Sequence, residues 1–121
     1  MRYILLIYAD MRADETMSAA EQNAIFQEYY AVTHEMAKRG VHIGGSPLQP
    51  VNTATTVRVR NRQVLMTDGP FAETQEQLCG YYLLNCKNLD EALEFAAKIP
   101  DARTGSVEVR PIQELGNPLT A

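Results

Sequence analysis

The sequence contains few of the residues that form metal centres, redox sites or nucleophilic triads. Its 121 residues include two cysteines and two histidines, and these lack the close spacing of zinc ligands. There is no G-x-S-x-G element, and Gly44-Gly45-Ser46 is too short for a phosphate-binding loop and precedes a proline instead of a helix. We therefore expect no metal site, no tightly bound cofactor and no nucleophilic triad.

Positive charge is also scarce. Lys and Arg total 11 against 15 Asp and Glu, which gives a formal net charge of −4. This balance does not favour broad attraction to nucleic acid or to an anionic membrane, because both require a positive field. No apolar run approaches the ~20 residues that span a bilayer. The composition predicts a soluble globular protein that binds neither nucleic acid nor membrane.

The two cysteines give an indication of the cellular compartment. Cys79 and Cys86 are expected on one extended strand, where seven steps of ~3.3 Å put them ~23 Å apart. A disulfide requires Cα atoms within about 7 Å, so these two cannot bridge each other on that strand. Unpaired cysteines are typical of a reducing compartment, and the apolar run at 3–9 is not followed by the cleavage site of an export signal. We predict a cytoplasmic protein.

The hydrophobic pattern predicts one α+β domain over residues 1–115 and a flexible tail at 116–121. A polar loop is expected at 10–17, and glycines and prolines make 44–53 irregular. Strands are predicted at residues 3–9, 41–43, 55–60, 63–67, 80–86 and 106–112, the third and fourth of them joined as a hairpin through Asn61-Arg62.

Two helices are predicted from their capping signals. Ser18 with Glu21 begins one that runs to about Gly40, and Asn88 with Glu91 begins one that ends at Pro100. The residues expected to face inward are Ile25, Tyr29, Val32 and Met36 in the first helix and Leu89, Ala92, Leu93, Ala96 and Ile99 in the second.

The strands at 3–9 and 80–86 are apolar on both alternating faces. Two helices can cover only one face of the sheet that contains them. Burial of a large side chain contributes ~1.5–3 kcal/mol, so a bare second face would forgo much of the driving force and would invite association. We predict a homodimer in which two sheets pack face to face about a two-fold axis.

The segment Asp68-Gly69-Pro70-Phe71-Ala72-Glu73 resembles the motif that defines the DGPF branch of the YCII-related family. The likeness covers essentially the whole chain to about Ile112, with the matching segments in the same order. These segments include Gly44-Gly45, Thr55-Thr56-Val57-Arg58, Gly80-Tyr81-Tyr82 and Val107-Glu108-Val109-Arg110-Pro111. The resemblance implies a ferredoxin-like antiparallel sheet with two helices on one face, paired into a dimeric α/β barrel. It implies no single activity. Members of the branch are often encoded beside extracytoplasmic-function sigma factors, so a sigma factor is one candidate partner.

Candidate chemistry is concentrated between Asp68 and Glu76. If the carboxylates at positions 68, 73 and 76 converge in a partly apolar cavity, desolvation and mutual repulsion raise one pKa toward neutrality. Asp68 and Glu73 are therefore the candidate catalytic acid or base. In the alternative interpretation the segment is a rigid turn, with Gly69 and Pro70 setting the chain path and the acids in water.

Four further residues are candidate substrate contacts. Phe71 could wall an apolar compound, Tyr8 and Tyr82 could add a polar tip to that wall, and Arg58 could bind an anion. Core packing is the default interpretation for the tyrosines, and a charged strand edge that discourages aggregation is the default for Arg58. His34 is interpreted as a solvated helix position.

Two classes of function remain open. One is a cofactor-free enzyme that transfers protons, as an isomerase or lyase does, on a small aromatic or anionic compound. The other is a non-catalytic ligand-sensing or partner-binding module linked to sigma-factor regulation. The sequence does not separate them, because a fold of this kind supports both.

Overall fold

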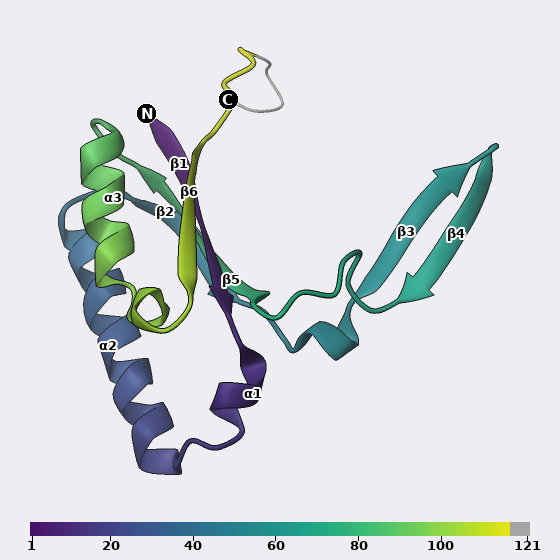
Figure 1. Ribbon diagram of the computed structural model, residues 1–121. Helices are drawn as coiled ribbons and strands as arrows, with labels where there is room; N and C mark the ends of the chain where they lie inside the picture. Colours follow the sequence, from purple (N-terminus) through teal and green to yellow (C-terminus); the bar gives the residue numbers. More distant parts are fainter. Residues whose placement is uncertain (117–121) are drawn as a thin grey trace.

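The structure is a computed structural model and describes residues 1–116. A four-stranded antiparallel sheet forms the centre, two long helices pack on one of its faces, and a hairpin projects on the other side (Figure 1). The strands of the sheet are β1 (Arg2–Ala9), β2 (His42–Pro47), β5 (Gln77–Asn85) and β6 (Ser106–Pro111), in the order β2-β5-β1-β6. This confirms the predicted α+β class with an antiparallel sheet. Except for its first residue, the tail predicted at 116–121 lies outside the described residues.

The two central strands, β1 and β5, bury alternate side chains against the helices. Leu5 pairs with Tyr82 and Tyr3 with Leu84, and all four side chains are buried. The alternating residues Ile4, Leu6 and Tyr8 of β1 and Tyr81 and Leu83 of β5 face the opposite side and are only half-buried. Both faces of these strands therefore carry apolar side chains, as predicted, and no helix of residues 1–116 covers the second face (Figure 1).

The helices α2 (Ala19–Lys38) and α3 (Leu89–Lys98) form the layer on the covered face. Both predicted caps are confirmed. The Ser18 hydroxyl accepts a hydrogen bond from the Glu21 N–H at 3.1 Å, and the Asn88 side chain accepts one from the Glu91 N–H at 3.0 Å. After α3 a short 3-10 helix, η2 (Pro100–Arg103), leads into β6. None of the described helices is long and apolar enough to cross a membrane.

The inward face predicted for α3 is partly wrong. Ala92, Ala96 and Ile99 are buried as predicted, but Leu89 and Leu93 are each 45% exposed. Phe95 is fully buried instead. Because the helix turns its largest apolar ring toward the sheet, the buried stripe is centred on Phe95, and the two leucines lie at its edge.

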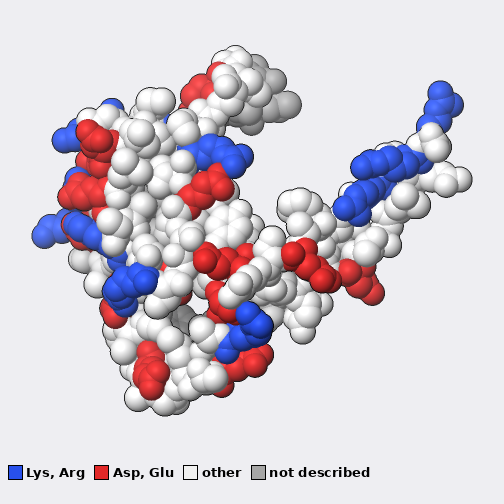
Figure 2. Space-filling view, viewed as in Figure 1, with Lys and Arg blue, Asp and Glu red and all other residues white. Residues whose placement is uncertain are grey.

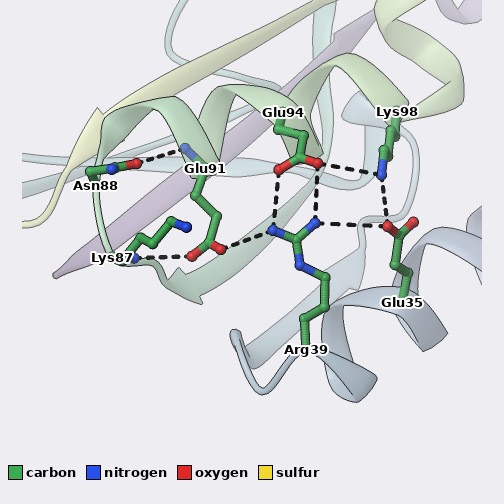
Figure 3. Close-up of polar contacts among 7 residues, drawn as sticks. All are labelled: Glu35, Arg39, Lys87, Asn88, Glu91, Glu94 and Lys98. Atoms are coloured by element: carbon green, nitrogen blue, oxygen red, sulfur yellow. Dashed lines mark hydrogen bonds and ion pairs between the residues drawn. The ribbon is translucent and has the colours of Figure 1, made fainter.

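A network of charges joins α2 to α3 above Phe95 (Figure 3). Arg39 donates to Glu91 at 2.9 Å and to Glu94 at 3.1 Å, and its guanidinium lies 4.5 Å from the centre of the Phe95 ring. Lys98 donates to Glu35 at 2.7 Å. The network closes the helix layer at its outer side, far from the hairpin, so we assign it to stability.

Two predicted loops contain regular structure. A short helix, α1 (Met11–Asp14), begins at Asp10 within the loop expected at 10–17. β2 continues through Gly44 and Gly45, and a 3-10 turn, η1 (Val51–Thr53), follows it. A Cβ atom on Gly45 would lie 2.6 Å from the carbonyl oxygen of Tyr81, so the glycine allows β2 to approach β5 instead of breaking the strand.

The predicted hairpin is confirmed as β3 (Thr55–Arg60) and β4 (Gln63–Asp68). Its turn residues Asn61 and Arg62 have φ of 51° and 64°. This is the positive-φ pair of a type I′ turn, whose twist suits a two-residue hairpin. The two strands form a sheet of their own and do not join the central one. We call residues 55–68 the arm.

Candidate functional site

The segment that follows the arm is anchored where the arm leaves the body. The Gly69 N–H donates to the Ala54 carbonyl at 2.7 Å, and the Thr56 hydroxyl donates to the Gly69 carbonyl at 2.8 Å. Gly69 has a φ of 102°, a conformation that residues with a side chain rarely adopt. Gly69 therefore acts as a structural turn that closes the base of the arm.

A cavity of about 600 Å³ lies beside this turn. Its walls come from α1 and its cap, from η1, from the segment between β4 and β5, and from the first residue of β5. The lining residues are Asp10, Arg12, Val51, Asn52, Gly69, Pro70, Glu73, Thr74, Gln75 and Gln77. Carboxylates, amides and one guanidinium thus meet beside a larger apolar surface, a combination found in sites for small molecules.

Asp10 and Arg12 form an ion pair at the cavity. The Arg12 guanidinium donates to both Asp10 oxygens, at 3.1 and 3.0 Å, and the Arg12 backbone N–H donates to Oδ1 at 3.0 Å. These side-chain and backbone hydrogen bonds lower the pKa of Asp10, and the Gln75 side chain adds to the effect. Asp10 caps α1 through the same oxygen, so its carboxylate is fixed in position and ionised at neutral pH.

The three predicted carboxylates have different surroundings. Glu73 lines the cavity, whereas Asp68 and Glu76 are not among its lining residues. Glu76 accepts a hydrogen bond from the Ser106 hydroxyl at 2.7 Å. Asp68 and Glu73 are exposed, and within residues 1–116 no hydrogen bond or ion pair engages either carboxylate. Of the two candidate acids or bases, only Glu73 is in position to reach a molecule in the cavity.

The single chain does not bring the other candidate contacts to this cavity. Phe71 is 80% exposed, and Arg58 is exposed on the arm. Tyr82 is buried between sheet and helices, where its hydroxyl and that of Thr33 lie 2.7 Å apart in a hydrogen bond. Tyr8 is half-buried on the opposite face of the sheet. The two tyrosines are therefore separated by the sheet itself.

The sequence reasoning missed the residues that complete the cavity. Asp10 and Arg12 lie far in the chain from Asn52 and Gln77, and none of the four was a candidate. Asp10 carried one usable signal, since it is an Asp directly after a buried strand and can cap a following turn. Asn52 had no such signal in the sequence, because its position at the cavity depends on the path of the chain between β2 and the arm.

Comparison with known proteins assigns the family. The YCII-related domain matches residues 1–116, which is nearly the whole chain. The uncharacterised protein R00369 of Rhizobium meliloti (strain 1021) is 39% identical over 114 residues, a match that covers 93% of this chain and 92% of that protein. A match of this extent to both the domain and a full-length relative means that the chain belongs to the YCII-related family.

Proposed function

We propose that this protein binds a small polar molecule in the cavity at the base of the arm and catalyses a proton transfer there, as in an isomerisation or an elimination. One observation carries the proposal: the unpaired carboxylate of Glu73 lines a cavity of about 600 Å³ together with the hydrogen-bonded Asp10–Arg12 pair. This volume is within the range of small-molecule sites. No metal or prosthetic group is needed for this chemistry.

The charges in the lining favour a neutral or cationic ligand. Asp10 and Glu73 supply two carboxylates, whereas Arg12 supplies one guanidinium that is already hydrogen-bonded to Asp10. An anion would meet a net negative wall. Arg58, the candidate anion contact, is on the arm and outside this lining.

The two carboxylates have separate roles in this proposal. Asp10 stays ionised and orients the ligand through its fixed oxygens, while Glu73 accepts or donates the proton. A carboxylate becomes an effective acid or base near neutral pH when it is desolvated. Glu73 is exposed in the single chain, so the proposal requires that the bound ligand or a second subunit cover it.

We also propose the homodimer, the ferredoxin-like arrangement and the dimeric α/β barrel. Ile4, Leu6, Tyr81 and Leu83 make the uncovered face of the sheet apolar. The strand order β2-β5-β1-β6 with both long helices on one face supports the ferredoxin-like arrangement. The motif at 68–73 supports membership of the DGPF branch, and the absence of a disulfide between Cys79 and Cys86 is compatible with the cytoplasm.

Hydrogen exchange in substrates tests the proposed activity even when the reaction product is not identified. Small neutral and cationic carbonyl compounds, with carboxylates as a comparison class, are incubated with the protein in D₂O, and proton NMR detects exchange of their C–H protons. We expect exchange of a neutral or cationic compound, at least ~100-fold slower with Glu73→Gln.

Asp68→Asn is the matched control, because Asp68 is a nearby exposed carboxylate outside the cavity. It should leave the exchange rate unchanged. Equal losses in both variants, with unaltered melting temperatures, would contradict the assignment to Glu73. Full exchange in Glu73→Gln would remove the proposed mechanism.

The alternative function is a non-catalytic module that senses a ligand or binds a partner such as a sigma factor. One observation favours it: Asp68, Phe71 and Glu73 are all exposed on one short segment, as a docking surface requires. The test is binding of a purified extracytoplasmic-function sigma factor from the source organism. Binding that Phe71→Ala weakens would support this function, and the lack of any complex would count against it.

A further inference from the structure

The arm is exposed along its whole length. Its two strands pair only with each other among the described residues, and it stands clear of the sheet and helices (Figure 1). All residues of β4 are exposed, and in β3 all but Thr56 are. A two-stranded hairpin in water is marginally stable on its own. An arm of this kind therefore requires a second surface to hold one conformation.

One face of the arm is an apolar stripe. Val57 pairs with Met66 and Val59 with Val64, so these four side chains lie on the same face. Their exposed fractions range from 57% to 71%. The opposite face carries Arg58 and Arg60 across from Leu65 and Gln63. Four large apolar side chains together on an isolated element indicate a contact surface.

The charge of the arm is opposite to that of the rest of the chain. Residues 55–68 contain three arginines and one aspartate, which leaves eight basic and 14 acidic side chains elsewhere. Figure 2 shows basic side chains along the arm and acidic ones where it joins the body. A second copy of this chain thus presents a net negative surface to an approaching arm, which favours association between identical copies.

The direction and length of the arm also point to a second copy. The arm leaves the body on the side of the uncovered sheet face (Figure 1). Six residues of extended chain span ~20 Å, whereas two sheets packed face to face lie ~10 Å apart. An arm of this length passes beyond the layer of the second sheet. Its stripe then lies beside the flank of the second subunit.

We infer that the arm clasps a second copy of this chain, with the stripe of Val57, Val59, Val64 and Met66 packed on the flank of that copy and the net positive charge of the arm attracted to its net negative surface. The inference rests on the proposed homodimer and adds an exchanged element to it. Each subunit gives one arm and receives one, as a two-fold axis requires.

The test changes the stripe without changing the fold of the single chain. In the triple variant Val57→Thr/Val59→Thr/Val64→Thr, each side chain keeps its branched shape and its preference for strands but becomes polar. Leu65→Thr is the matched control, since Leu65 is exposed on the opposite face of the arm. Sedimentation velocity over a range of concentrations gives the dimer dissociation constant for each protein.

We expect the dissociation constant to rise at least tenfold in the triple variant and less than threefold in Leu65→Thr. Hydrogen exchange should show the arm amides of the wild type protected in the dimer and unprotected in the triple variant. An unchanged dissociation constant in the triple variant, or fast exchange of the arm amides in the wild-type dimer, would overturn the inference.

Leu6→Glu separates this inference from the proposed homodimer. Leu6 lies on the uncovered sheet face and not on the arm. A wild type that stays monomeric overturns both proposals. A dimer that Leu6→Glu disrupts and the stripe variant leaves intact overturns the role of the arm alone.

Discussion

Replacement of Leu6 by Glu tests the physical basis of the proposed assembly. Leu6 lies at the centre of the uncovered face, opposite Tyr81 on β5 and Glu108 on β6, and it is half-buried in the single chain. Full burial of a leucine contributes about 1.5–3 kcal/mol, and because Leu6 is no more than about a third exposed, up to ~0.5–1 kcal/mol of this is left to be contributed by assembly. Each dimer contains Leu6 twice, and the loss is therefore up to ~1–2 kcal/mol.

This loss corresponds to a roughly 5- to 30-fold rise in the dimer dissociation constant, and the buried charge of the glutamate adds to it. Sedimentation velocity measures the constant. The control is Leu93→Glu, since Leu93 is also partly exposed but lies on α3, on the covered side of the sheet. If both variants dimerise like the wild type, the uncovered face is not the interface, and the reasoning from its apolar side chains fails.

Three further predictions concern stability. Phe95→Ala removes the largest fully buried ring and should cost ~3–5 kcal/mol, or about 10–20 °C in a thermal melt; Leu93→Ala, at the exposed edge of the same helix, should cost far less. Because the pKa of Asp10 is lowered by the Arg12 contact, its stabilising contribution is present at neutral pH and disappears as the pH falls through that lowered pKa; Asp10→Asn should reduce the acid-side loss in an unfolding titration. Burial and the hydrogen bond to Asp101 raise the pKa of Tyr29, so its contribution is present below about pH 10 and is lost at higher pH, and Tyr29→Phe should flatten that alkaline decline.

Local signals in the sequence account for the features of the fold that were predicted. Ser18 and Asn88 cap their helices through contacts within three residues, so the sequence nearby is sufficient to place both helix starts. The turn at Asn61-Arg62 is equally local. The strands that are apolar on both faces were predictable because strand side chains alternate strictly. A short run that is mainly apolar on both faces is typical of a strand whose two faces are both covered.

The errors come from tertiary contacts. The rotation of α3 about its axis depends on how Phe95 fits under Arg39, which the helical period alone does not determine. β2 continues through two glycines because β5 lies close enough to need them, and the same dipeptide in isolation predicts a loop. The cavity could not be predicted for the same reason, since it joins Asp10 to Glu73 across most of the chain.

The arm and the cavity share one junction, and this would link the proposed assembly to the proposed activity. Gly69 fixes the base of the arm through Ala54 and also lines the cavity. In the proposed dimer, a subunit that holds the arm would also restrain the wall that carries Pro70 and Glu73, and we expect it to limit the access of water to the glutamate. Turnover per chain should then follow the fraction of dimer as the protein is diluted through its dissociation constant. Measurement of D₂O exchange rates across that range checks this prediction, and a constant rate per chain would mean that the cavity works in the isolated subunit.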